Sequence, residues 1–128
     1  MVFKKHFTLD EAREYLPWLR ESFSRIREII TEMRSIGFNI YMGNFIPGFN
    51  PDTLEPYPRR YNDLLDILDE INEEGIEIKD LEKGLIDFPA LRTNGDEVYL
   101  CWLADENDIR YWHSLEGGFK GRRPVEEF

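Results

Sequence analysis

The residues of this chain that could do chemistry lie mostly between Gly84 and Arg123. Asp87 and His113 are the most informative pair, because a carboxylate beside an imidazole raises the pKa of the imidazole and fixes its tautomer. General acid–base catalysis and metal ligation both need this control. We therefore take Asp87 and His113 as candidate catalytic residues. In the alternative interpretation, Asp87 anchors backbone N–H groups and His113 is a structural histidine.

The Gly/Arg-rich tail at residues 114–128 suggests a different chemistry, the binding of an anion. Its glycines let the backbone approach an anion closely, and its basic side chains supply positive charge. A basic tail folded onto the chain's own acidic surface is the other interpretation. With two aromatic residues added, the predicted ligand-binding set is Trp102, Tyr111, Lys120, Arg122 and Arg123.

The sequence gives little reason to expect a metal ion. Structural zinc takes four Cys or His ligands, whereas the chain offers only Cys101, His6 and His113. The acidic turn at 105–108 lacks the spacing and the glycine of an EF-hand calcium loop. We therefore expect neither a metal site nor a cofactor.

Size and charge limit the class of protein. The chain has 128 residues and a net charge of −10, which fit one globular domain over 1–128. An acidic chain is a poor general binder of nucleic acid or anionic membranes, because both need clustered Lys and Arg. Cys101 has no partner for an internal disulfide, the first residues contain no apolar run of signal-peptide length, and no stretch approaches the ~20 apolar residues of a membrane span. We expect a cytoplasmic location.

Two helices are expected in the first part of the chain. Thr8 and Glu11 form a capping box, and apolar residues then recur at spacings of three and four, which predicts a helix over 8–36. Pro17 should bend this helix without dividing it. A second helix is predicted over 59–74.

The connection at 37–58 shows no periodicity and is rich in proline, glycine and aromatic residues. We expect an irregular segment packed over the helices. A ligand lid is the alternative, because long loops are sometimes functional.

Asn94-Gly95 predicts a β-hairpin with a two-residue loop, because both central residues of a type I′ turn need positive φ. It lies within an expected β-meander over 84–113. Counting outward from this turn pairs Asp87 with Trp102 and Phe88 with Cys101.

A third strand is expected at 109–113, after a turn at 105–108, although its register is less certain. Taking these four residues as the whole loop pairs Leu100 with His113, and side chains alternate across a sheet. One face is then predicted to hold Asp87, Leu100, Trp102, Tyr111 and His113, and the other Phe88, Cys101, Leu103 and Trp112. This arrangement separates Cys101 from His113 and argues against a Cys–His nucleophile pair or a shared metal site.

The predicted fold is α+β: a long antiparallel helical hairpin packed on a small three-stranded antiparallel β-sheet. The first helix would be about 42 Å long at 1.5 Å per residue, whereas strands of eight residues reach only ~27 Å. Part of its apolar stripe would therefore extend beyond the sheet. We expect a homodimer through the helices to cover it.

Motifs along the chain occur in the same order in a known family. They are Phe7-Thr8-Leu9-Asp10-Glu11-Ala12, Leu16-Pro17, Gly75-Ile76, Lys79-Asp80-Leu81, Gly84-Leu85-Ile86-Asp87-Phe88-Pro89-Ala90, Leu100-Cys101-Trp102, Tyr111-Trp112-His113 and Gly118-Phe119-Lys120-Gly121-Arg122. In these motifs the chain resembles DUF2203, a prokaryotic family of unknown function. The resemblance implies a small cytoplasmic protein and no established activity. Where the family usually reads Gly-Glu after the Leu-Cys-Trp strand, this chain reads Ala104-Asp105-Glu106.

Two classes of function follow. The first is a non-enzymatic binding or assembly module that holds an anionic small molecule or a protein segment. The alternative is a small hydrolase-like enzyme, with His113 as general base, Asp87 orienting it, and Arg122 or Lys120 holding an anion. The enzyme needs Asp87 and His113 within hydrogen-bond distance in an open pocket that contains the basic tail.

Overall fold

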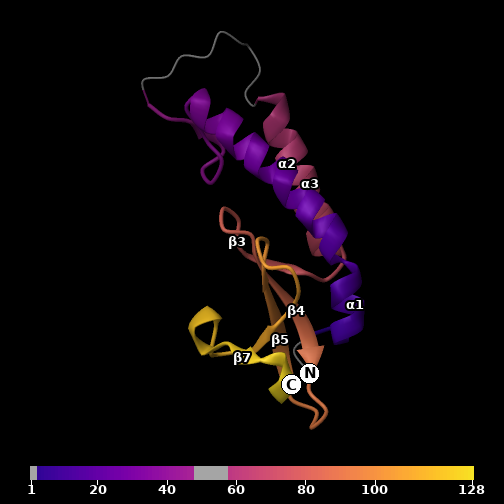
Figure 1. The fold of residues 1–128 in the computed structure, drawn as a ribbon. Coiled ribbons are helices and arrows are strands. Elements are labelled where there is room, and N and C mark those ends of the chain that lie inside the picture. The colour runs from indigo at the N-terminus through magenta and orange to yellow at the C-terminus, as the bar shows by residue number, and fades with distance from the viewer. Residues whose placement is uncertain (1–2, 48–57) are drawn as a thin grey trace.

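The computed structural model describes residues 3–47 and 58–128. The described part of the chain contains three α-helices, a two-stranded sheet and a five-stranded antiparallel sheet (Figure 1). The mixed α and β composition is as predicted. The prediction of one long helical hairpin on a three-stranded sheet was wrong, because the first helix is divided and the sheet has two more strands.

The first helical region is two helices, α1 (Leu9–Glu14) and α2 (Leu16–Ser35). The capping box is confirmed, since the Thr8 hydroxyl accepts from the Glu11 N–H at 3.1 Å and the Glu11 carboxylate accepts from the Thr8 N–H at 3.1 Å. The prediction of a single bent helix was wrong. Pro17 has no N–H to donate to the preceding turn. The helix is therefore interrupted at Tyr15, and a new helix begins with Pro17 in its first turn.

Helix α3 (Arg59–Glu73) runs antiparallel beside α2 (Figure 1), and its position agrees with the prediction for 59–74. The apolar stripe of α2 is largely covered within the chain, because α3, the sheet and the following hairpin all pack on it. Its buried residues are Leu16, Leu19, Phe23, Ile26, Ile29, Ile30 and Met33. The excess apolar surface that suggested a dimer is therefore much smaller than expected.

The connection between the helices is partly regular. It forms a short hairpin of β1 (Phe38–Asn39) and β2 (Asn44–Phe45), where an irregular segment was predicted. Phe38 is buried, with its ring centroid 5.0 Å from that of Phe45 and 4.8 Å from that of Tyr61. The prediction of a segment packed on the helices holds for this part, while residues 48–57 lie outside the described residues.

The five strands of the larger sheet follow one another in chain order. Strands β4 (Leu85–Leu91), β5 (Glu97–Leu103) and β6 (Tyr111–Ser114) form the predicted meander. The two edge strands, β3 (Glu77–Asp80) and β7 (Arg123–Pro124), were missed. Both are short, and β7 contains a proline, which is tolerated only where a ladder hydrogen bond is not needed.

The turn between β4 and β5 corrects the predicted register by one residue. Only Gly95 has positive φ there, +91°, and the Arg92 N–H donates to the Asp96 carbonyl at 2.9 Å. The loop is therefore the three-residue kind, a type I turn followed by a left-handed glycine, and not a two-residue type I′ turn. Asp87 consequently pairs with Cys101, not with Trp102.

The turn between β5 and β6 shifts the register by a second residue. The Glu106 carboxylate accepts from the Leu103 N–H at 2.7 Å, and the indole of Trp102 donates to the Glu106 carbonyl at 3.0 Å. These bonds extend the turn, so β6 begins at Tyr111, two residues later than predicted. Tyr111 pairs with Cys101, where Trp112 had been expected.

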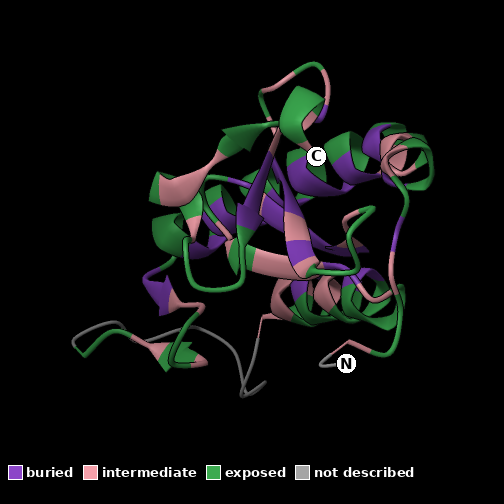
Figure 2. Cartoon of the chain, turned by 90° about the horizontal axis from the view of Figure 1, so that it is seen from below, coloured by how far each residue is buried: buried purple, intermediate pink, exposed green. Residues whose placement is uncertain are grey.

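The two register shifts compensate each other between β4 and β6, so these strands keep their predicted faces relative to each other. Strand β5, which lies between them, does not. Asp87, Tyr111 and His113 share a face as predicted, whereas each side chain of β5 lies on the face opposite to its prediction. The helices cover the other face, where the aromatic ring of Phe88 contacts those of Phe7 and Tyr15. The buried residues gather in the layer between helices and sheet, as Figure 2 shows. The sheet face away from the helices (here called the open face) carries the candidate site.

Candidate functional site

One row of side chains crosses four strands of the open face. Glu77 of β3 pairs with Asp87 of β4, Asp87 with Cys101 of β5, and Cys101 with Tyr111 of β6. His113 lies two residues beyond Tyr111 on the same strand and face. A polar row in the middle of a sheet brings these groups together from four separate segments of the sequence.

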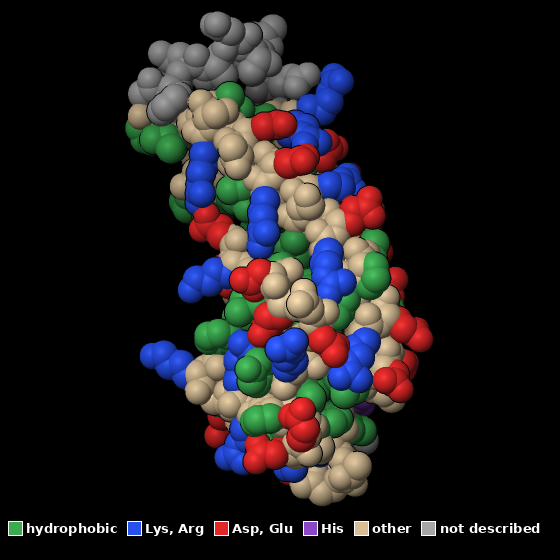
Figure 3. Space-filling model, in the orientation of Figure 1, with side chains coloured by type: hydrophobic (Ala, Val, Ile, Leu, Met, Phe, Trp, Pro, Cys, Tyr) green, Lys and Arg blue, Asp and Glu red, His purple; other side chains and the backbone are tan. Residues whose placement is uncertain are grey.

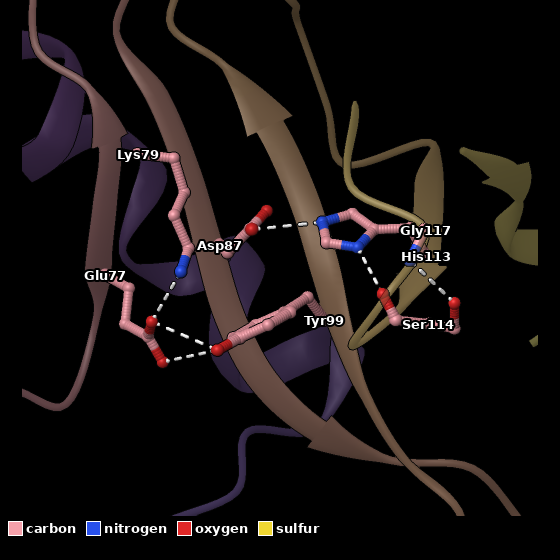
Figure 4. A network of polar contacts seen from close by, with 7 residues as sticks. All are labelled: Glu77, Lys79, Asp87, Tyr99, His113, Ser114 and Gly117. Carbon is pink, nitrogen blue, oxygen red and sulfur yellow. Dashed lines mark hydrogen bonds and ion pairs between the residues drawn. The ribbon is translucent and has the colours of Figure 1, made fainter. Parts of the chain in front are cut away.

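Asp87 and His113 form a buried pair. His113 Nε2 lies 3.0 Å from Asp87 Oδ2, and the two side chains are only 3% and 4% exposed (Figure 4). His113 Nδ1 lies 2.7 Å from the Ser114 carbonyl. A carbonyl oxygen can only accept, so Nδ1 carries a proton and Nε2 faces the carboxylate. Both ring nitrogens therefore face protein groups.

Cys101 joins this pair. One ligand atom from each of Asp87, Cys101 and His113 lies within 4.8 Å of the other two, and all three residues are buried. The prediction that Cys101 and His113 lie on opposite faces was wrong, because it rested on the two-residue hairpin loop. The argument against a shared metal site that depended on this prediction no longer applies.

The pKa values follow from burial and from the Asp87 charge. Burial, and then the negative charge of Asp87, raises the pKa of the Cys101 thiol to about 12. Burial alone would lower the pKa of His113, but the hydrogen bonds to Asp87 and to the Ser114 carbonyl outweigh it and raise that pKa. Without a metal ion, Cys101 is therefore a protonated thiol and not an activated nucleophile.

Asp87 is incompletely bonded. Its Oδ2 faces His113, while its Oδ1 is buried and has no hydrogen-bond partner among the described residues. An unsatisfied buried acceptor costs about 1–3 kcal/mol. The carboxylate thus keeps one oxygen available for an additional partner.

Three long side chains cover one side of this cluster. The Tyr99 hydroxyl donates to both Glu77 oxygens at 3.0 Å, and Lys79 Nζ lies 2.8 Å from Glu77 Oε1 (Figure 4). Lys79 Nζ also lies 4.8 Å from the centre of the Tyr99 ring. The Tyr99 ring packs beside the His113 imidazole, with 5.3 Å between centroids. Sequence reasoning had not included these three residues in the site.

Arg122 and Glu106 cover the side near Tyr111. The guanidinium carbon of Arg122 lies 4.0 Å from the centre of the Tyr111 ring, and its Nη2 donates to both Glu106 oxygens at 2.8 and 2.9 Å. Arg122 Nε is buried and has no partner among the described residues. The Arg122 side chain is therefore held in place with one donor unused.

The predicted ligand-binding residues do not form one cluster. Tyr111 and Arg122 lie together on the open face. Trp102 is fully buried on the helix side, and Arg123 stacks at 5.7 Å on Trp112 of that same side. Lys120 is exposed in a short 3₁₀ helix, Phe119–Gly121. Anion binding by the whole set stays a prediction. Arg122 is the basic residue of the set that lies on the open face with Tyr111.

A signal in the sequence could have located Cys101 correctly. In β4 the apolar residues alternate as Ile86, Phe88 and Ala90, and in β5 as Val98, Leu100 and Trp102. Placing both apolar sets on one face gives the observed register and puts Cys101 beside Asp87.

The surface over α2 shows no such concentration of groups. In Figure 3, Lys and Arg side chains alternate with Asp and Glu along this face. Several meet as ion pairs, including Arg60 with Glu32 at 3.1 Å and Arg34 with Glu82. Exposed pairs of this kind contribute little stability and indicate a solvated surface.

Comparison with protein families identifies the chain. The profile of an uncharacterised conserved family, DUF2203, matches residues 5–125. This chain belongs to the DUF2203 family. No curated protein and no solved structure matched it.

The family assignment confirms the resemblance seen in the motifs and supplies no activity. Asp87, Cys101, His113 and Arg122 of this DUF2203 chain each lie in one of those motifs. Among its described helices, none is both long and apolar enough to span a membrane.

Proposed function

We propose that this DUF2203 protein is a metal-binding module in which Asp87, Cys101 and His113 bind one divalent transition-metal ion. The observation that carries the proposal is their convergence from three adjacent strands, with ligand atoms within 4.8 Å of one another. The expectation of no metal at these residues rested on two grounds. The separation of Cys101 from His113 depended on the wrong strand register, whereas the shortage of Cys and His ligands argues only against a closed structural zinc site.

The tautomer of His113 supports this proposal. Histidines that bind metals usually donate the second ring N–H to a carbonyl or carboxylate, which fixes the ring and leaves the other nitrogen as ligand. His113 has this arrangement, with Nδ1 on the Ser114 carbonyl at 2.7 Å and Nε2 toward Asp87 and Cys101. An ion between these groups would also give Asp87 Oδ1 the partner that it lacks.

The ligand chemistry favours zinc. A thiolate, an imidazole and a carboxylate form a mixed sulfur, nitrogen and oxygen set, which suits Zn²⁺ and related transition metals better than Mg²⁺ or Ca²⁺. The Cys101 thiol would lose its proton on binding, as coordinated thiols do. Three protein ligands leave a fourth position on a tetrahedral ion, which is typical of sites that also take an external ligand.

The hydrolase alternative has less support. The Asp87–His113 distance meets the first of its two requirements, but the pair is buried and not in an open pocket. A general base needs a free nitrogen facing the substrate, whereas both nitrogens of His113 face protein groups.

The experiment is a metal titration of the reduced, metal-free protein. Co²⁺ is the spectroscopic probe, because a bound thiolate gives a ligand-to-metal charge-transfer band, and competition with a chelator gives the Zn²⁺ affinity. We expect one ion per chain. Cys101→Ser should remove the band and weaken Zn²⁺ binding by more than about a hundredfold, since loss of an outer-shell partner alone costs ten- to a hundredfold.

His6→Gln is the matched control. His6 is the other histidine of the chain, lies 3.0 Å from Glu97 and is not one of the three clustered residues. The His6→Gln variant should bind Co²⁺ and Zn²⁺ as the wild type does. A protein that binds no Co²⁺, or a Cys101→Ser variant that keeps the wild-type Zn²⁺ affinity, would refute the proposal.

We also propose that the protein associates through the hairpin end of the helices, in place of the covered α2 stripe. Exposed apolar side chains support this: Tyr41 is 65% and Met42 70% exposed, with Ile36 and Ile46 nearby in sequence. Sedimentation at micromolar concentration should show a dimer that Met42→Asp weakens. A monomeric wild type would rule out this assembly.

A further inference from the structure

Arg122 lies beside the proposed metal site on the open face. Its guanidinium stacks on Tyr111, and Tyr111 pairs with Cys101 across the β5–β6 ladder. Arg122 thus stacks on the residue that pairs with a proposed ligand of the ion.

The present partner of Arg122 uses only part of its donor capacity. Both hydrogen bonds to Glu106 come from Nη2, so the pair is not the two-nitrogen fork that binds carboxylates most strongly. Nε is buried with no acceptor among the described residues. Glu106 has a second role, accepting from the Leu103 N–H at 2.7 Å, which holds it in the turn.

An anion at the fourth coordination position needs a compensating positive charge. A carboxylate from Asp87 and a thiolate from Cys101 would neutralise a divalent ion, so a further anionic ligand would leave the centre negative. A guanidinium close by offsets that charge, and the attraction between the two charges is strongest where water is excluded. Arg122 is 12% exposed.

We propose that Arg122 clamps a small oxyanion, of the carboxylate class, that completes the coordination of the metal ion. Glu106 occupies the guanidinium in the ligand-free protein and competes with the incoming anion. This inference rests on the proposed metal site. It predicts opposite effects for the two members of the ion pair.

The test uses the Co²⁺-loaded protein and acetate as the probe, at constant ionic strength. Acetate binding is followed by the change in the visible cobalt spectrum. Arg122→Gln should weaken acetate by about ten- to a hundredfold, the value of one charge-assisted hydrogen bond. Glu106→Gln should bind acetate more tightly than the wild type, because it keeps the acceptor for Leu103 and removes the competing charge.

Arg110→Gln controls for the loss of one positive charge. Arg110 is exposed and lies directly before Tyr111. This variant should bind acetate as the wild type does. The Co²⁺ affinity is measured separately for each variant, and acetate is then added at Co²⁺ concentrations that saturate the site of that variant.

The outcomes separate the two proposals. If Co²⁺ binds but acetate leaves the spectrum unchanged, or binds Arg122→Gln and wild type equally, the oxyanion clamp is refuted and the metal site stands. If Co²⁺ itself does not bind, both proposals fail. A Glu106→Gln variant that binds acetate more weakly than the wild type would also refute the competition.

Discussion

The two faces of the five-stranded sheet are built on opposite physical principles, although neighbouring residues of the same strands supply both. Phe88 is fully buried against the rings of Phe7 and Tyr15, which lie just before α1 and between α1 and α2, and its neighbour Asp87 is 3% exposed on the other face. The helix face gains stability from apolar burial. The open face buries a carboxylate, a thiol and an imidazole without covering helices. Burying these polar groups costs stability, and the same burial creates the candidate site.

The largest expected effect is on the helix face. Phe88→Ala should lower the free energy of unfolding by about 3–5 kcal/mol, because it leaves a cavity in the core. Denaturant titrations should give the same loss with and without Zn²⁺, since Phe88 points away from the cluster. A loss that depends on Zn²⁺ would show that the two faces are coupled.

The next effect belongs to the open face. Zn²⁺ should stabilise the wild type by about 2.7 kcal/mol at a free concentration one hundred times its Kd. Phe88→Ala should retain this increment, and His113→Gln should lose it. The measurement is denaturant unfolding in a Zn²⁺ buffer and in EDTA, and an undiminished increment in His113→Gln would contradict the assigned ligand.

The pH dependence of the metal-free protein gives a smaller effect. The folded state raises the pKa of His113 above its ordinary value of 6.5, so folding takes up a proton. The stabilisation is complete below about pH 6.5 and is lost as the pH rises through the higher folded pKa. Asp87→Asn removes the charged partner, so stability should then fall less over this range.

Denaturant titrations in EDTA across this pH range provide the measurement, and NMR of the two imidazoles provides the pKa values. His6 is the internal reference. An unchanged His113 pKa in Asp87→Asn would show that the pair does not set the titration.

The smallest effect concerns the cover of the open face. Tyr99→Phe removes a hydroxyl that donates to Glu77 at 3.0 Å and keeps the ring beside His113. It should cost about 0.5–1 kcal/mol, the net value of an ordinary hydrogen bond. Zn²⁺ affinity should stay unchanged, as measured by chelator competition. A large loss of affinity would mean that Glu77 and Tyr99 hold the ligands in place.

Local sequence signals determined much of the fold. The Thr8–Glu11 capping box and the apolar spacing that follows it are properties of adjacent turns, so the helix start could be read directly. The start of α3 followed from Pro58 for the same reason. The division at Tyr15 could not be read as surely, because a proline permits both a bend and a break, and packing selects between them.

The candidate site was only half determined by the sequence. Asp87 and His113 were placed on one face through two register errors that cancel, so their agreement with the structure was partly fortuitous. Cys101 was misplaced because the turn at Asn94-Gly95 was given more weight than the alternation of apolar residues. A turn dipeptide is compatible with loops of different length, whereas burial of a whole strand face decides on which face each residue of the strand lies.

The sequence by itself determined which residues could do chemistry, where the helices begin and that a meander carries the polar groups. Only the tertiary structure decided that Asp87, Cys101 and His113 converge and that Arg122 lies beside them paired with Glu106. The reason is the two-residue period of a strand. A change of one residue in a loop moves every side chain of the next strand to the other face, and burial against the helices selects the face that is kept.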